Sequence, residues 1–218
     1  MDALCRTLFA LAVRIVTVFW LGYSLRGAEH LPRRGPAIVI ANHNSHLDAL
    51  ILFSLFPIGL APSISIAAAA DYFFSGSVRR FLAERFAGLV PIARHGGRDP
   101  LGPAAAALQR GNVLILFPEG TRGAPDVMGD IKPGLRHLAR RFPRVPVCPV
   151  YLHGPGRSLP KGCRIPVPIF IDICAGAPFF PTTDREAFPR QIRSLFENLR
   201  AQTLAGLADP QDDDDGYA

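Results

Sequence analysis

The sequence predicts a single α/β domain in which helices flank a central, mostly parallel mixed sheet, with a long apolar helix at the N-terminus. Three observations predict this fold. Short apolar and β-branched runs recur along the chain, helical segments lie between them, and 218 residues suffice for one well-buried core. Because strands alternate with helices, we expect a largely parallel sheet covered on both faces.

The N-terminal apolar stretch, residues 8–25, carries Arg14 at its centre and Arg6 and Arg26 at its flanks. It is barely long enough to span a bilayer. A central arginine would also raise the cost of insertion by about 2.5–3.5 kcal/mol. A helix that lies in the interface avoids this cost because Arg14 can reach the lipid headgroups. We therefore expect residues 1–25 to form a membrane-interface helix rather than a spanning one, and a cleavable signal peptide fits poorly.

A second apolar stretch, residues 49–70, contains no charged residue. Pro57, Gly59 and Pro62 interrupt it and divide it into a helix-like half and a strand-like half. Each half is too short to cross a membrane, so we expect two buried elements of the domain.

The remaining elements follow from the same patterns, and they assign residues 26–207 to one domain. The acidic tail, residues 208–218, is expected to be solvated and disordered. The Pro- and Gly-rich stretch 153–168 is expected to be a long surface loop. Strands are expected at 37–41, 63–67, 88–93, 112–117, 145–152 and 167–174, and helices at 46–56, 76–87, 102–110, 133–142 and 184–206.

The charge distribution limits the class of partner. Five of the 18 acidic residues lie in the tail, so residues 1–208 carry 24 basic and 13 acidic side chains, a net charge of +11. A basic body suits phosphate-bearing small molecules, anionic lipids or nucleic acid. The four cysteines are scattered without a C-x-x-C pair, which argues against a zinc ribbon or a disulfide framework and fits a reducing compartment.

A polar cluster follows the first expected strand, at the place where open α/β sheets bind ligands. Ser45 and Asp48 have the spacing of a capping box, so a helix is expected to begin near Ser45. His43 then lies in the strand-to-helix turn, and this turn can bring its imidazole to the Asp48 carboxylate. Such a pair fixes the tautomer and leaves one ring nitrogen as a base. The simpler interpretation is that Asp48 only caps the helix. His46 is a rival base, expected on the exposed helix face.

A second polar cluster, Phe117 to Arg122, follows the strand expected at 112–117. Gly120 permits close backbone approach, Thr121 offers a hydroxyl, and Arg122 offers a bidentate fork for a phosphate. Glu119 can accept a hydrogen bond from a substrate hydroxyl or orient Arg122. A charged turn with an internal Glu–Arg pair is the structural alternative.

Together, N-H-x-S-x-x-D and F-P-E-G-T-R resemble the glycerolipid acyltransferase family, which includes lysophosphatidate acyltransferases. Two weaker motifs, at residues 88–94 and 145–150, also resemble that family, and the resemblance covers about residues 25–180. There are two departures: a lysine that many members carry before the intermediate motif is missing, and that motif reads P-I-A-R. The residues that match are Asn42, His43, Ser45 and Asp48, then Phe117, Pro118, Glu119, Gly120, Thr121 and Arg122, and finally Arg94 and Pro149.

The resemblance implies a role for each matched residue. His43 and Asp48 are expected to be catalytic. Substrate binding is expected from Arg94, Glu119, Gly120, Thr121 and Arg122. A supporting role is expected from Asn42, Ser45, Phe117, Pro118 and Pro149, the last of which would lie near the acyl chain or shape the site.

The resemblance also implies a reaction. An acyl group would pass from acyl-CoA or an acyl carrier protein to a lysophospholipid hydroxyl, most simply that of 1-acyl-glycerol-3-phosphate, giving phosphatidate. Lysophosphatidylethanolamine or a lyso-aminolipid is the alternative acceptor. No metal and no cofactor beyond the acyl donor is expected. The protein is expected at an anionic membrane surface, peripheral or monotopic, with its site on the cytoplasmic side.

Other classes of protein remain as alternatives. A lipid-binding membrane protein with a decayed site would keep the same fold, but His43, Asp48 and Glu119 are intact. Nucleic-acid binding is suggested by the excess of arginine, yet no nucleic-acid-binding motif accompanies it. We therefore expect no nucleic-acid partner. A nucleotide-dependent enzyme is disfavoured because neither G-x-x-x-x-G-K-[ST] nor G-x-G-x-x-G occurs.

Overall fold

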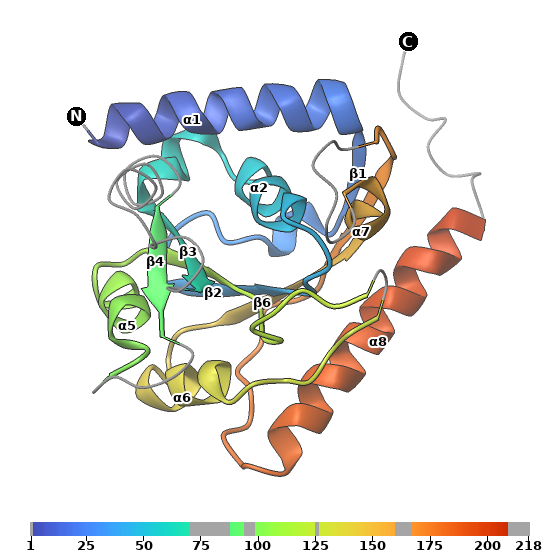
Figure 1. Ribbon diagram of the computed structural model, residues 1–218. Helices are drawn as coiled ribbons and strands as arrows, with labels where there is room; N and C mark the ends of the chain where they lie inside the picture. Colours follow the sequence, from blue (N-terminus) through green and yellow to red (C-terminus); the bar gives the residue numbers. More distant parts are fainter. Residues whose placement is uncertain (1, 70–87, 94–98, 125–126, 160–166, 209–218) are drawn as a thin grey trace.

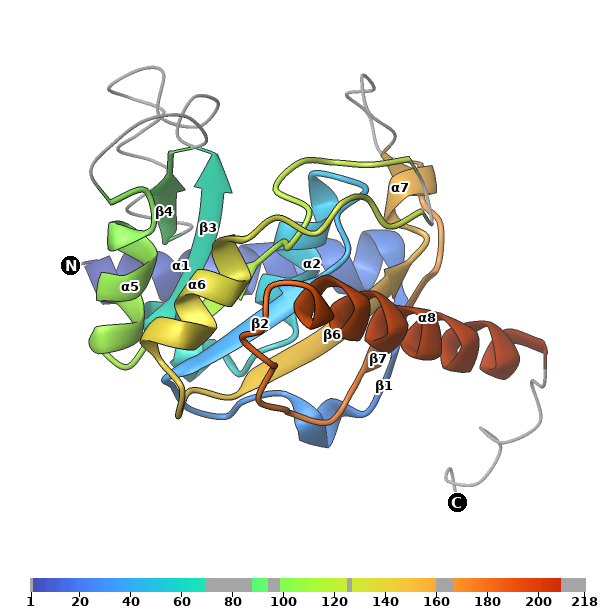
Figure 2. The same ribbon diagram turned by 90° about the horizontal axis from the view of Figure 1, so that it is seen from below.

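The computed structural model describes residues 2–69, 88–93, 99–124, 127–159 and 167–208. These residues form a sheet of seven strands between two helical layers (Figure 1). In the view of Figure 2, α6 and α8 lie in front of the sheet and α1 lies behind it. The predicted α/β fold with a mostly parallel mixed sheet is confirmed.

The strand order is β1-β7-β6-β2-β5-β3-β4. Every neighbouring pair is parallel except β6 and β7, which are antiparallel. The strands are β1 (Tyr23–Arg26), β2 (Ala37–Ala41), β3 (Ile64–Ala69), β4 (Leu89–Ile92), β5 (Val113–Leu116), β6 (Val147–His153) and β7 (Ile171–Ala175).

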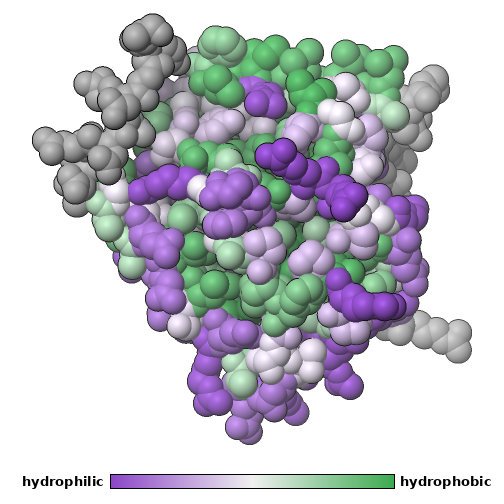
Figure 3. Space-filling model, turned by 180° about the vertical axis from the view of Figure 1, so that it is seen from behind, coloured by the Kyte–Doolittle hydropathy of each residue, from purple (hydrophilic) through white to green (hydrophobic). Residues whose placement is uncertain are grey.

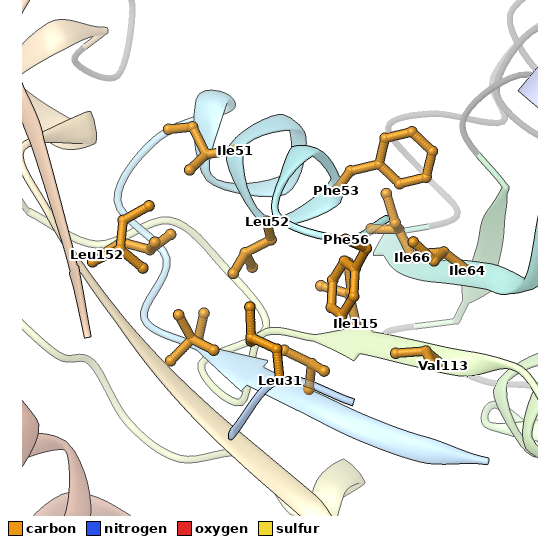
Figure 4. Packing of buried hydrophobic residues seen from close by; sticks show 14 of the residues in the cluster. Leu31, Ile51, Leu52, Phe53, Phe56, Ile64, Ile66, Val113, Ile115 and Leu152 are labelled. Atoms are coloured by element: carbon orange, nitrogen blue, oxygen red, sulfur yellow. The ribbon is translucent and has the colours of Figure 1, made fainter. Parts of the chain in front are cut away.

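The central strand β2 is buried on both faces because its sequence, AIVIA, is apolar at every position. Alternate residues point to opposite sides, so Val39 joins one core and Ile38 joins the other. Figure 4 shows the first core, where Leu52 and Phe56 point towards the strands.

The helices divide between the two faces of the sheet. The first face carries α1 (Asp2–Val16), the π-helix η1 (Thr17–Leu21), α2 (Leu47–Ser54) and the 3-10 helix η3 (Ile58–Ser63), which pack against one another. The second face carries α5 (Gly102–Gln109), α6 (Gly134–Arg141) and α8 (Ala187–Ala208). Two short helices, η2 (Ala28–His30) and α7 (Pro155–Ser158), lie in connections.

The N-terminal helix differs from its predicted extent. It begins at Asp2, and its last turn ends at Leu21, so the expectation that the helix continues to residue 25 is wrong. Gly22 adopts a φ of 68°, a conformation that favours glycine and ends the helix. Tyr23–Arg26 then pairs in parallel with β7 as an edge strand. The sequence stays apolar across the change from helix to strand, so composition does not mark the boundary.

The second apolar stretch divides as predicted. Helix α2 ends at Ser54, a 3-10 turn that contains Pro62 follows, and β3 begins at Ile64. The loop expected at 153–168 contains the short helix α7. The helix expected at 76–87 and most of the acidic tail lie outside the described residues.

Candidate functional site

The two polar clusters meet because β2 and β5 are parallel neighbours. Ile40 of β2 is in register with Leu116 of β5, so the carboxyl ends of both strands emerge side by side. The turn after β2 carries His43, and the turn after β5 carries Glu119. The site therefore lies at the carboxyl edge of the sheet, as expected for a parallel sheet.

The first feature of the site is a paired histidine and carboxylate. Nδ1 of His43 lies 2.9 Å from Oδ2 of Asp48. The Asp48 side chain is 1% exposed, whereas that of His43 is 18% exposed. With the carboxylate accepting at Nδ1, the other ring nitrogen, Nε2, keeps a lone pair and can accept a proton. The structure thus brings together the two residues that the sequence predicted to pair.

Asp48 also organises the turn that carries the histidine. Its Oδ2 accepts hydrogen bonds from the main-chain N–H groups of Asn44 (2.6 Å) and Ser45 (2.8 Å). Among the described residues, nothing donates to the buried Oδ1. Helix α2 begins at Leu47, and the Leu47 N–H donates to Ser45 Oγ at 3.2 Å. Asp48 therefore holds the turn that precedes the helix and the imidazole at once, whereas no side-chain hydrogen bond caps the helix itself.

The ring of His43 is also held by an aromatic face. The His43 and Phe117 rings stack with centroids 4.0 Å apart and an interplanar angle of 19°. Phe117 is the first residue after β5 and is buried. Stacking on one side and the Asp48 bond at the edge leave the imidazole little rotational freedom. The sequence placed Phe117 in the site but gave no sign that it contacts the histidine.

Glu119 joins the two clusters through the main chain. Its Oε1 accepts from the His43 N–H at 2.8 Å, and its Oε2 accepts from the Gly129 N–H at 2.7 Å. The side chain is 1% exposed, and burial raises the carboxyl pKa while these two hydrogen bonds oppose the rise. The sequence suggested that Glu119 contacts a substrate hydroxyl or Arg122. In the structure, both carboxylate oxygens of Glu119 instead accept hydrogen bonds from backbone N–H groups. Contact between Glu119 and a substrate stays a prediction.

Further main-chain bonds lock the loop after β5 onto the histidine turn. The Gly123 N–H donates to the His43 carbonyl at 2.8 Å. The Asn44 amide donates to the carbonyls of Ala124 and Val127. Asn44 was not among the predicted site residues. The available signal was its position directly after His43, in the turn that follows a buried strand, because a buried amide side chain must find hydrogen-bond partners.

Gly120, Thr121 and Arg122 form the outer part of the second cluster. Gly120 has a φ of 67°, which favours glycine in this turn. Thr121 is exposed and Arg122 is partly exposed, so both side chains can be reached from solvent. The preceding Pro118 accepts a hydrogen bond from the Lys132 N–H at 2.8 Å, which closes the base of the loop.

The supporting residue Asn42 lies directly after β2, and the supporting residue Pro149 lies within β6. Asn42 accepts from the Leu152 N–H at 2.8 Å and donates to the Leu152 carbonyl at 2.9 Å, so it joins β2 to β6. Pro149 lies within β6, in register with Ile40, and its carbonyl accepts from the Gly176 N–H at 2.9 Å.

The last two candidates have different outcomes. His46, expected on an exposed helix face, is partly buried directly before α2. Burial lowers its pKa, the electrostatic effects of Arg122 and His43 lower it further, and that of Asp48 opposes them. His46 is therefore electrostatically coupled to the site. Arg94 lies outside the described residues.

Comparisons with known proteins add to this geometry. The crystal structure of the 1-acyl-sn-glycerophosphate acyltransferase PlsC from Thermotoga maritima superposes with a TM-score of 0.70 at 21% identity, over 90% of this chain and 77% of that one. At this identity the match concerns the fold.

Curated relatives match at the level of sequence. The 1-acyl-sn-glycerol-3-phosphate acyltransferase of Limnanthes douglasii is 30% identical over 169 residues, 72% of this chain and 55% of the relative. The human 1-acyl-sn-glycerol-3-phosphate acyltransferase alpha is 31% identical over 144 residues, 64% of this chain and 48% of the relative. The chain thus spans about half the length of these relatives.

A family model described as Acyltransferase matches residues 23–153. That span runs from β1 to β6 and contains His43, Asp48 and the whole loop after β5. The chain therefore belongs to the acyltransferase family.

Proposed function

We propose that this protein is an O-acyltransferase that moves a fatty acyl group from a thioester donor to the free hydroxyl of a lysophospholipid. The observation that carries the proposal is the 2.9 Å contact between His43 and the buried Asp48. Family membership supports the class of reaction. The names of the relatives support 1-acyl-glycerol-3-phosphate as the acceptor and phosphatidate as the product.

In the proposed reaction, Nε2 of His43 takes the proton of the acceptor hydroxyl. The oxygen attacks the thioester carbonyl carbon, so a C–O bond forms and the C–S bond then breaks. His43 returns the proton to the leaving thiolate, which departs as a free thiol. The Asp48 carboxylate holds the tautomer and stabilises the imidazolium between the two proton transfers. Placing both substrates beside one base removes much of the entropic barrier.

The acceptor headgroup is assigned to the outer part of the second cluster. Arg122 is partly exposed and offers a bidentate fork that fits a phosphate. The neighbouring Thr121 hydroxyl is exposed and can bind the glycerol part. A phosphate monoester gains most from such a site, which favours lysophosphatidate over lysophosphatidylethanolamine or a lyso-aminolipid.

Helix α1 supports a position at the membrane. The segment Ala3–Leu21 meets the length and composition of a membrane-crossing helix. One side of it packs on the domain through Ala10, Val13 and Leu21. The opposite side exposes apolar side chains along its length. Figure 3 shows hydrophobic residues gathered along the top of the molecule, where this helix lies. The exposed residues are Leu4, Leu8, Leu11, Ile15, Val16, Val18, Phe19 and Trp20.

This arrangement favours a helix that lies in the interface of an anionic membrane. A helix whose inner side packs along the domain cannot also be surrounded by lipid. The apolar outer side would enter the acyl-chain region, while Arg14, which is exposed, reaches the headgroups. We infer a peripheral or monotopic protein with its site on the cytoplasmic side, where acyl thioesters are available.

The test is product identification. Purified protein is incubated with labelled acyl-CoA or acyl carrier protein and a panel of lysolipids, and the products are identified by mass spectrometry. Labelled phosphatidate formed from lysophosphatidate supports the proposal. Lipid binding without release of free thiol from any donor, under conditions in which the protein is folded, would instead favour a catalytically inactive lipid-binding protein.

A further inference from the structure

A cavity of about 230 Å³ opens on the second face of the sheet, beside the histidine turn. Asn42, the residue before His43, lines it, together with the apolar or aromatic side chains of Met128, Tyr151 and Phe196. Tyr151 and Phe196 are buried, so this part of the wall is built from the core. The residues that we assign to the acceptor, Thr121 and Arg122, do not line this cavity.

The outer wall of the cavity is basic. Arg193 and Arg200 of α8 both line it. They are two helical turns apart, so they lie on the same side of α8, about 10 Å from each other along its axis. Both are exposed, and neither forms an ion pair or hydrogen bond with any described part of the chain. Glu197 lies between them and also lines the cavity, which leaves a net positive wall.

The position of α8 decides which substrate can reach this wall. Helix α8 packs on β6 and β7, on the face of the sheet opposite α1 (Figures 1 and 2). If α1 lies on the membrane, the α8 arginines face the aqueous side. A lysolipid acceptor comes from the bilayer, whereas the carrier of an acyl thioester is soluble in water. The basic wall thus fits an anion that arrives from solution.

We propose that this cavity binds the phosphopantetheine arm of the acyl thioester donor, with Arg193 and Arg200 at its phosphate. The proposal rests on the acyl-transfer function proposed above. The methylene and methyl groups of the arm pack on Met128 and Phe196, and the guanidinium groups bind the phosphate oxygens by charge-assisted hydrogen bonds. Coenzyme A and acyl carrier protein carry the same phosphate, so the same wall serves either carrier.

The test compares three donors that carry one acyl chain: acyl-CoA, acyl carrier protein and an N-acetylcysteamine thioester, which has no phosphate. Arg193→Ala and Arg200→Ala should each raise KM for the phosphate-bearing donor about five- to tenfold. The KM for the acceptor and that for the phosphate-free thioester should not change. Glu197→Gln should lower KM for the phosphate-bearing donor about two- to threefold because it removes a repulsive charge. Arg140→Ala, an exposed arginine on α6, is the matched control.

The outcomes separate this proposal from the proposed function. If the wild-type protein transfers no acyl group to any acceptor, the function itself fails. If the wild type is active and the α8 variants leave the donor KM unchanged, or raise it equally for the phosphate-free thioester, the donor site is wrong. A loss of binding to acidic vesicles with an unchanged donor KM would likewise overturn it in favour of a lipid headgroup. The carrier whose KM changes identifies the source of the phosphate.

Discussion

The main-chain N–H of His43 donates a 2.8 Å hydrogen bond to the carboxylate of Glu119, which lies 76 residues away along the chain. The same carboxylate accepts from the Gly129 N–H at 2.7 Å. Glu119 therefore holds the histidine turn and the loop after β5 at a fixed separation. Because both oxygens of this buried carboxylate bond to backbone groups, we propose that Glu119 acts as a positioning residue rather than as a substrate contact.

The first prediction concerns Glu119→Gln. A glutamine offers one oxygen acceptor, and its amide nitrogen would face the second N–H without a bond. We expect kcat to fall about tenfold or more and KM for the acceptor to change less than twofold, with a loss of about 1–3 kcal/mol in the free energy of unfolding. Steady-state kinetics and urea unfolding measure these effects. A large rise in acceptor KM at constant kcat would instead place Glu119 against the substrate.

The second prediction uses a glycine that contacts the same carboxylate. A Cβ at Gly129 would lie 3.0 Å from Oε2 of Glu119, so Gly129→Ala should displace the carboxylate and lower kcat severalfold. Gly59→Ala is the matched control because a Cβ there meets nothing within 4 Å. Equal activity of the Gly129 and Gly59 variants would show that the position of the Glu119 carboxylate does not limit the reaction.

The third prediction concerns pH and Cys148, which is buried in β6. Burial raises the pKa of its thiol from 9.0 to about 11. The thiol pKa is higher in the folded state than in the unfolded state, so between about pH 9 and 11 the unfolded thiol loses its proton while the folded thiol keeps it. The free energy of unfolding therefore falls as pH rises from about 9 to 11. The loss is about 2–3 kcal/mol.

Urea unfolding at pH 8 and pH 10.5 measures this loss. The free energy of unfolding of the wild type should fall more over this interval than that of Cys148→Ala. Parallel losses in the two proteins would show that the Cys148 thiol does not couple stability to pH.

The fourth prediction concerns the membrane. Phe19 and Trp20 are 85% and 55% exposed at the end of the N-terminal helix. Replacing both with serine should weaken binding to acidic vesicles about tenfold or more because their apolar surface no longer enters the interface. Phe180→Ser removes a similarly exposed aromatic side chain elsewhere and should leave binding unchanged. Vesicle sedimentation gives both values, and unchanged binding of the double variant would exclude this surface.

The sequence predicted the parts of the site that depend on chain order. A buried strand followed by a turn and a helix start brings His43 to Asp48, and two parallel strands bring the two clusters together. It did not predict the stacking of Phe117 on His43 or the carboxylate bridge of Glu119. Both depend on which side chains of a turn point inward, and residue spacing within irregular backbone does not determine this. The strand at Tyr23–Arg26 was missed because the apolar run continues across Gly22 without a break.

The central claim is that His43, held by Asp48, is the base for acyl transfer. The most direct measurement is the single-turnover rate of thiol release from the acyl donor, with acceptor present, for the wild type, His43→Ala and Asp48→Asn. Folding and vesicle binding are checked in parallel. We expect His43→Ala to lose at least about 10³-fold and Asp48→Asn about 10²-fold or more, with the fold retained. A folded His43→Ala protein that releases thiol at the wild-type rate would contradict the claim.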